Sequence, residues 1–169
     1  MLRTAAAVAL LVIGPAALAQ DAWGLAKKAV GGSATAKLEK EVNQRLLAES
    51  RKSQCSFKSG TDELEPGCDG KMKRLFDAVV SAKKKLNGAG VKNFKFVVSG
   101  HTDSTGSAPA NKELSGKRAA VVVRELVAKG IPAGEIEAVG MGSEKMLVKP
   151  DDTPAKKAKN RRYEVQVRL

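Results

Sequence analysis

The sequence has few of the residues from which metal centres and nucleic-acid platforms are built. Two cysteines and one histidine among 169 residues exclude a four-cysteine zinc site and a histidine-rich metal cluster. A single tryptophan, a single tyrosine and an aromatic content of 4% leave little for stacking against bases. Acidic residues are also scarce, because 18 Asp and Glu stand against 30 Lys and Arg, for a net charge of +12. The length predicts one domain. The scarcity of these residues leads us to expect no metal, no cofactor and no nucleic-acid partner.

Long apolar runs are equally scarce, and the one that exists lies at the start of the chain. Arg3 precedes an unbroken apolar run over residues 5–13, Gly14-Pro15 follows it, and residues 17–19 read Ala-Leu-Ala. This order of basic, apolar and small residues is typical of a secretory signal peptide, so we predict cleavage after Ala19, with residues 1–19 removed. The alternative is an uncleaved membrane anchor, although the run has about half of the ~20 residues that a span needs.

Cleavage would leave 150 residues (169 − 19) with a net charge of +11, since only Arg3 is lost. No later stretch is apolar enough to predict a membrane span, and no cysteine follows the cleavage site as a lipid anchor would require. Export places the chain in an oxidising compartment, where we predict that Cys55 and Cys68 form a disulfide. The alternative for this pair is two free thiols.

Between the signal peptide and the main domain, residues 20–36 are small, polar and glycine-containing, which predicts a flexible lead-in. Leu38, Val42 and Leu46 then recur at helical spacing between charged residues, so we predict an amphipathic helix that completes a segment over residues 20–52. Its narrow apolar stripe has two uses that remain open at this point. The stripe over residues 37–52 either packs on the main domain or pairs with a second copy or an envelope partner.

The main domain is predicted over residues 53–169, where helical and strand periodicities alternate. A buried strand over 94–99 precedes helical spacing from 111 to 129, and strict alternation over 163–169 marks a strand with one buried face. The order β-α-β-α-β-β predicts an α+β fold in which a layer of helices covers one sheet. The other expected elements are a strand around 55–57, a helix over 72–86, a strand over 136–141 and a loop over 142–160.

The residues most suggestive of a binding site follow the buried strand, in the segment Gly100–Gly106. Loops at the carboxyl ends of strands commonly hold ligands, and Asp103 is the carboxylate of this loop. Arg118 lies fifteen residues further on in the predicted helix, where the chain can bring both charges to one cleft. A carboxylate and a guanidinium at fixed separation suit a zwitterion, because each binds the opposite charge. The alternative is a structural salt bridge between Asp103 and Arg118.

Several motifs also match those of a known family, in order and at matching spacing. They are Phe96–Asp103 with Gly106, Asn111 with Leu114-Ser115 and Arg118-Ala119, Gly140–Glu144, and Asn160–Val165. Together they resemble the OmpA C-terminal-like (OmpA/Pal/MotB) domain family, from residue 53 to the C-terminus. The resemblance implies a two-layer sandwich of helices on a mixed sheet, and non-covalent binding of peptidoglycan through the meso-diaminopimelate of its stem peptide.

The resemblance also implies roles for particular residues. In the family, the aspartate and the arginine that match Asp103 and Arg118 hold the zwitterionic end of diaminopimelate. The positions that line or support that pocket are matched here by Thr102, Asn111, Leu114 and Arg161.

These expectations describe a binding module of the periplasm, with an anchoring role in the cell envelope and with association to the outer membrane left open, rather than an enzyme. Two alternatives are a periplasmic protein–protein adaptor or self-associating protein with secondary wall contact, and a polyanion binder whose affinity falls steeply with salt. We expect His101 to pack or hydrogen-bond in its loop and Asn160 to brace the last strand. We expect Gly106 and Gly140 to serve backbone geometry.

Overall fold

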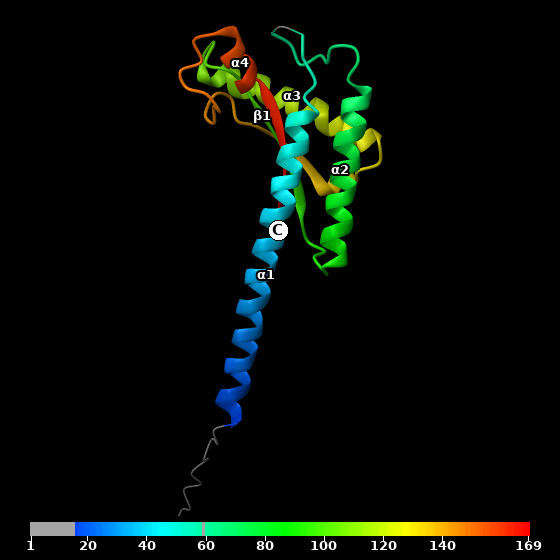
Figure 1. Ribbon diagram of the computed structural model, residues 1–169, viewed down its shortest axis with the longest axis vertical. Helices are drawn as coiled ribbons and strands as arrows, with labels where there is room; N and C mark the ends of the chain where they lie inside the picture. Colours follow the sequence, from blue (N-terminus) through cyan, green and yellow to red (C-terminus); the bar gives the residue numbers. More distant parts are fainter. Residues whose placement is uncertain (1–15, 59) are drawn as a thin grey trace, which may run out of the picture. The chain divides into compact units, whose positions relative to one another are not determined.

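The computed structural model describes the backbone of residues 16–58 and 60–169, and the side chains from residue 32 onward except that of residue 59. Most of the predicted signal peptide lies outside these residues. The elements in chain order are α1 (Ala16–Lys52), α2 (Asp69–Gly88), β1 (Lys95–His101), α3 (Ala108–Ala128), a 3₁₀ turn (Ala133–Glu135), β2 (Ile136–Gly140), α4 (Pro154–Asn160) and β3 (Arg162–Arg168) (Figure 1).

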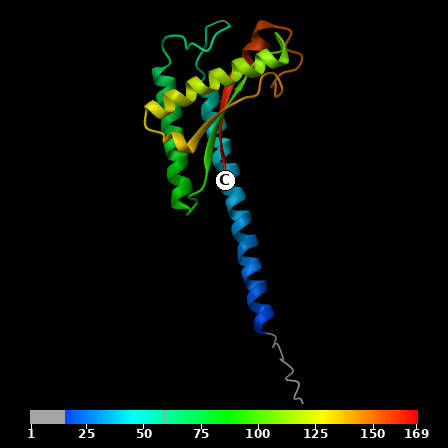
Figure 2. The same cartoon turned by 180° about the vertical axis from the view of Figure 1, so that it is seen from behind.

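The strands form a mixed sheet in the order β2-β1-β3. Strand β1 runs parallel to β2 and antiparallel to β3, with Val98 opposite Ala138 on one side and Val165 on the other. This arrangement confirms the predicted α+β class with helices on a mixed sheet. The parallel pair requires a crossover, which α3 supplies as it runs along β1 and β2. This helix is seen in the reverse view of Figure 2.

The N-terminal segment differs from the prediction. The backbone of residues 20–36 is helical as part of α1, where we predicted a flexible lead-in. Alanines recur through this stretch and proline is absent from it, so helix that forms over residues 37–52 can propagate backward, against a cost of about 1 kcal/mol at each of Gly24, Gly31 and Gly32. The compact unit that holds the sheet spans Lys37–Leu169. Among the described helices, none combines the length and apolarity needed to cross a membrane.

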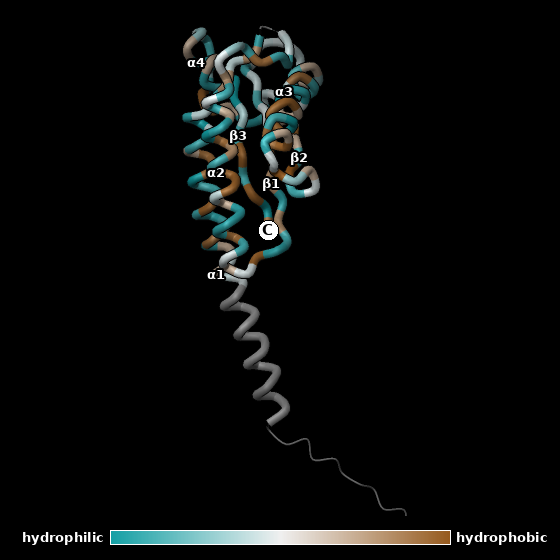
Figure 3. Tube along the Cα trace, turned by 90° about the vertical axis from the view of Figure 1, so that its right-hand side faces the viewer, coloured by the Kyte–Doolittle hydropathy of each residue, from teal (hydrophilic) through white to brown (hydrophobic). Residues whose placement is uncertain are grey.

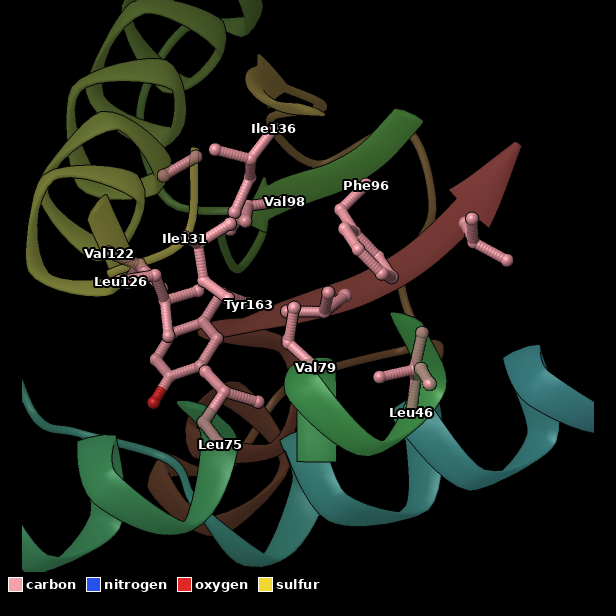
Figure 4. Close-up of a cluster of buried hydrophobic side chains, with 14 of the residues drawn as sticks. Leu46, Leu75, Val79, Phe96, Val98, Val122, Leu126, Ile131, Ile136 and Tyr163 are labelled. Carbon is pink, nitrogen blue, oxygen red and sulfur yellow. The ribbon is translucent and has the colours of Figure 1, made fainter. Parts of the chain in front are cut away.

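The apolar stripe of α1 packs within its own domain. Val42 and Leu46 are 2% and 1% exposed and belong to the main hydrophobic cluster, where Leu46 approaches Val79 of α2 and Phe96 of β1 (Figure 4). Figure 3 shows hydrophobic residues along the central strands and on one side of α2. Of the two uses left open for the stripe, the structure shows packing on the domain.

Helix α1 also covers the outer edge of β3, which has no strand partner on that side among the described residues. The Asn43 amide forms two bonds with Val167, accepting from its N–H at 2.7 Å and donating to its carbonyl at 3.0 Å. Unpaired backbone groups at a sheet edge would otherwise invite another chain to pair. At the same edge the Gln54 amide donates to the Tyr163 carbonyl and accepts its N–H, and the Ser50 hydroxyl accepts the Val165 N–H at 3.0 Å.

This covering helix explains why the strand predicted around 55–57 is reduced to a single antiparallel bridge between Phe57 and Leu64. The edge that an added strand would need is occupied by α1. The bridge lies in a segment closed by the predicted disulfide, which the structure contains between Cys55 and Cys68 with their Cα atoms 5.6 Å apart. The predicted loop over 142–160 also contains α4, whose first turn is capped by the Thr153 side chain.

Two glycines let α3 approach the sheet closely enough to bring its first turns over the strand ends. A Cβ at Gly100 would lie 2.1 Å from the Ser115 carbonyl oxygen, and one at Gly140 would lie 2.2 Å from that of Lys112. No other residue type fits at such separations, because backbone atoms form the obstacle. This contact sets the position of α3 relative to the loop that leaves β1.

Candidate functional site

A cavity of about 1000 Å³ lies at the carboxyl end of β1, at the upper end of the size range of small-molecule pockets. It is bounded by the loop after β1, by α3, by the end of α4 and by the disulfide-closed segment. All six residues predicted for the site line this cavity. They are Thr102, Asp103, Asn111, Leu114, Arg118 and Arg161.

Asp103 lies two residues beyond the end of β1 and is held in a fixed orientation. One carboxylate oxygen accepts the Thr105 N–H at 2.9 Å, and the other accepts Arg161 Nη1 at 2.7 Å. Burial raises the pKa of the Asp103 carboxyl, but the hydrogen bonds from Arg161 and Thr105 lower it by more than burial raises it. The pKa therefore lies below its ordinary value of 3.8. The group is therefore an anion at neutral pH, with a cation already beside it.

Arg118 projects from α3 and is half-buried at the other side of the cavity. Its Nε donates to the Thr61 carbonyl at 2.9 Å, its Nη2 donates to the Lys58 carbonyl at 3.5 Å, and its Cζ lies 5.0 Å from the centre of the Phe57 ring. Burial and the nearby charge of Arg161 lower its pKa, while Asp103 raises it. Among the described residues, the ion pair of Asp103 is with Arg161, so the alternative of an Asp103–Arg118 salt bridge is not observed.

Asn111, in the first turn of α3, supports the loop rather than pointing freely into the cavity. Its amide donates to the Thr105 carbonyl at 2.9 Å and, more weakly, to the Asp103 carbonyl at 3.5 Å. Thr102 is only 4% exposed, and its hydroxyl has no hydrogen-bond partner among the described residues. A buried hydroxyl without a partner is uncommon, and this oxygen is itself shielded from solvent. Leu114 adds a half-buried apolar wall.

Arg161 is positioned by a buried polar network behind it. The neighbouring Asn160 is fully buried, accepts the N–H groups of Leu147 and Val148, and donates to Asp151 at 3.0 Å. Hydrogen bonds from Ser104 lower the pKa of Asp151 to about 2, so this carboxylate ties the loop after β1 to the loop before α4. The Asn160 side chain thus braces the loop that precedes α4, and its carbonyl accepts a bond from Arg162, the first residue of β3, at 3.3 Å.

His101 lines the cavity as a neutral group. Burial, and then the charge of Arg162, lower its pKa to about 4 although Glu164 raises it. Neither ring nitrogen has a hydrogen-bond partner among the described residues, so the histidine packs without the loop hydrogen bond that we considered. No three His, Cys, Asp or Glu side chains gather as a metal site within the described part of the chain.

The cavity carries more positive than negative charge. Arg51, Lys157 and Lys159 line it in addition to the arginines already named, whereas its carboxylates are Asp103 and Glu65. Lys157 reaches across the mouth to the Thr105 hydroxyl at 2.9 Å. Such a surface attracts ligands that carry carboxylates, and one anionic point at Asp103 remains for an ammonium group.

Sequence reasoning did not identify Phe57 and Lys157 as lining residues. The sequence did carry a hint for Phe57, because an aromatic residue two positions after Cys55 must lie within the segment that the disulfide closes. Lys157 lies in a lysine-rich stretch that looks like an ordinary solvated face, and its place at the cavity follows only from the position of α4.

Comparison with models of known families shows to which family the chain belongs. A model of the OmpA family matches residues 56–161, which is more than half of the sequence, and the protein therefore belongs to the OmpA family.

Individual relatives agree over shorter stretches. Peptidoglycan-binding protein ArfA of Mycobacterium tuberculosis is 41% identical over 73 residues, 43% of this chain and 22% of ArfA. Outer membrane protein A of Klebsiella pneumoniae is 53% identical over 58 residues, 34% of this chain and 17% of that protein. The matches thus span about a fifth of each curated relative. The peptidoglycan-associated lipoprotein of Burkholderia pseudomallei shares the fold, with a TM-score of 0.55 and 23% identity over 68% of this chain and 89% of its own.

Proposed function

We propose that this protein binds peptidoglycan non-covalently through the zwitterionic end of meso-diaminopimelate in the stem peptide. The observation that carries the proposal is the presence of an ionised carboxylate, Asp103, and a guanidinium, Arg118, in one cavity. Membership of the OmpA family and the relation to a peptidoglycan-binding protein support it.

In the bound state, the ligand ammonium donates to Asp103, and the ligand carboxylate accepts from the N–H groups of Arg118 that are not bonded to Thr61 and Lys58. Arg161 is 45% exposed at its side chain, so it can turn outward as the ammonium arrives.

The proposal places the protein in the periplasm as an envelope component, after removal of residues 1–19. The positive rim of the cavity favours encounter with a wall that carries free carboxylates, because opposite charges raise association rates. This contribution is generic and falls with ionic strength, whereas the contacts to Asp103 and Arg118 give selectivity.

Co-sedimentation of the mature protein with diaminopimelate-containing sacculi tests the proposal. We expect the wild-type protein to pellet with the sacculi, and Asp103→Asn and Arg118→Gln each to reduce binding about tenfold or more, the effect of losing a charged hydrogen bond in a pocket. Matched controls are Asp77→Asn and Arg74→Gln, which make the same charge changes on exposed positions of α2.

The result against the proposal is that both pocket variants, folded by circular dichroism, pellet as the wild type does. If the binding affinity also falls by orders of magnitude between low and moderate salt, and Asp103→Asn leaves that affinity unchanged, the protein is instead a general polyanion binder.

A further inference from the structure

We propose that the disulfide-closed segment, residues 56–67, positions the guanidinium of Arg118, so that formation of the Cys55–Cys68 bond determines affinity for the anionic group of the ligand. The inference rests on the proposed function, because it concerns the same cavity. It adds a set of positioning residues and a redox dependence to that site.

Among the described residues, all contacts of the Arg118 guanidinium come from this one segment. Two of them are backbone carbonyls, those of Lys58 and Thr61, and the third is the face of the Phe57 ring. A bond to a carbonyl depends on where the backbone lies and not on which side chain the residue carries. The orientation of Arg118 therefore depends on the conformational order of the segment.

The segment is ordered by a small set of internal hydrogen bonds. Lys58 N–H donates to the Glu63 carbonyl at 2.9 Å, Glu65 N–H to the Ser56 carbonyl at 3.0 Å, and Thr61 N–H to the Lys58 carbonyl at 3.1 Å. The remaining bonds are exposed to solvent: the Thr61 hydroxyl donates to the Lys58 carbonyl at 3.3 Å and accepts the Glu63 N–H at 3.2 Å, and Lys58 Nζ pairs with Glu63 at 2.6 Å. Phe57 and Leu64 pack only partly against the core, and Ser56, Lys58, Gly60, Glu63 and residues 65–67 are exposed. A short exposed hairpin of this kind opens easily, and the disulfide restricts that opening by closing its ends.

Asp103 does not depend on the segment. Its partners are Thr105 and Arg161, and the buried network around Asn160 supports these from the other side of the cavity. Loss of the disulfide should therefore weaken the grip on the ligand carboxylate and leave the grip on the ammonium intact.

The dependence has a consequence for the compartment in which binding occurs. Disulfides persist in oxidising compartments and are rare where thiols are kept reduced. A pocket that needs the Cys55–Cys68 bond binds the ligand weakly in a reducing compartment and tightly in an oxidising one.

The test is a double-mutant cycle read by calorimetric titration. The proteins are mature wild type, the pair Cys55→Ser with Cys68→Ser, Arg118→Gln, and the triple variant. The probe is a disaccharide carrying L-Ala-γ-D-Glu-meso-diaminopimelate, together with the same compound amidated at the carboxyl of its zwitterionic end. Wild type is also titrated after reduction of the disulfide.

We expect reduction, or the serine pair, to lower affinity for the free-carboxyl probe about tenfold, with no further loss once Arg118 is already Gln. The amidated probe should bind weakly to all proteins and show no response to reduction. Lys58→Ala removes the side-chain bond to Glu63 and keeps the carbonyl that Arg118 uses, so any loss of affinity it causes should likewise vanish in the Arg118→Gln background. If the serine pair does not fold, Phe57→Leu with the disulfide intact enters the same cycle and should lose affinity in the same Arg118-dependent way.

Two results would overturn the inference while the proposed function stands. One is a folded, reduced wild-type protein that binds the free-carboxyl probe as tightly as the oxidised one. The other is an equal loss in the wild-type and Arg118→Gln backgrounds, which would mean that the disulfide acts on the fold in general. Failure of oxidised wild type to bind the probe at all would instead refute the proposed function.

Discussion

The contact between Gly140 and α3 yields a prediction whose size follows from the structure. In Gly140→Ala, the new Cβ would lie 2.2 Å from the Lys112 carbonyl oxygen and 2.7 Å from the Gly116 nitrogen. The first distance is 1.2 Å short of the 3.4 Å at which ordinary contact begins (3.4 − 2.2). Both obstacles are backbone atoms, so no side-chain rotation relieves the overlap, and α3 must move away from β2.

We place the cost at about 3 kcal/mol, the upper part of the usual range for overpacking, which lowers the melting temperature by about 10 °C in a domain of this size. The displaced helix carries Asn111 and Arg118, so wall binding should weaken even where the variant is still folded. Gly134→Ala is the matched control, because a Cβ there meets nothing within 4 Å. Thermal unfolding of the two variants at the same temperature within about 2 °C would refute this account of the close packing.

Two further predictions concern stability. Asn43→Ala should lower the free energy of unfolding in urea by about 2 kcal/mol, since the backbone groups of buried Val167 lose their partners. Gln44→Ala, on the exposed face of the same helix, should leave it unchanged. Equal values for the two variants would contradict the role given to α1. Because burial lowers the pKa of His101 from 6.5 to about 4, the folded state favours its neutral form, and about 3 kcal/mol of stability should be lost as pH falls from 6.5 to 4. In His101→Gln that slope should flatten, and an unchanged slope would assign the pH dependence to other groups.

The elements that could be predicted from the sequence are those whose signal is local. Alternation over 163–169 marks β3, and apolar residues through Leu114, Val122 and Leu126 mark α3, because each pattern reflects burial of one face of a single element. The strand expected around 55–57 depended instead on a free edge at β3. That edge is occupied through polar side chains of α1, which an apolar periodicity does not reveal.

The candidate site shows the same division. Asp103 and Arg118 were predicted to share a cleft and they line one cavity, since a loop after a strand and the next helix are adjacent in such folds. Arg161 was expected at the pocket, but the particular bonds that Asp103 and Arg118 make could not be predicted. Arg161 pairs with Asp103 across 58 positions, and Thr61 accepts from Arg118 across 57. The second contact uses a backbone carbonyl, which every residue possesses and which therefore leaves no mark in the sequence.

The two charges of the site thus rest on different kinds of support. Asp103 is held by residues of the motifs shared with the family, Arg161 and the network of Asn160. Arg118 is held by a disulfide-closed segment that lies at the margin of the family match, which begins at residue 56. A chain can therefore keep both charged residues and still differ in affinity, because the segment that orients the guanidinium can change independently.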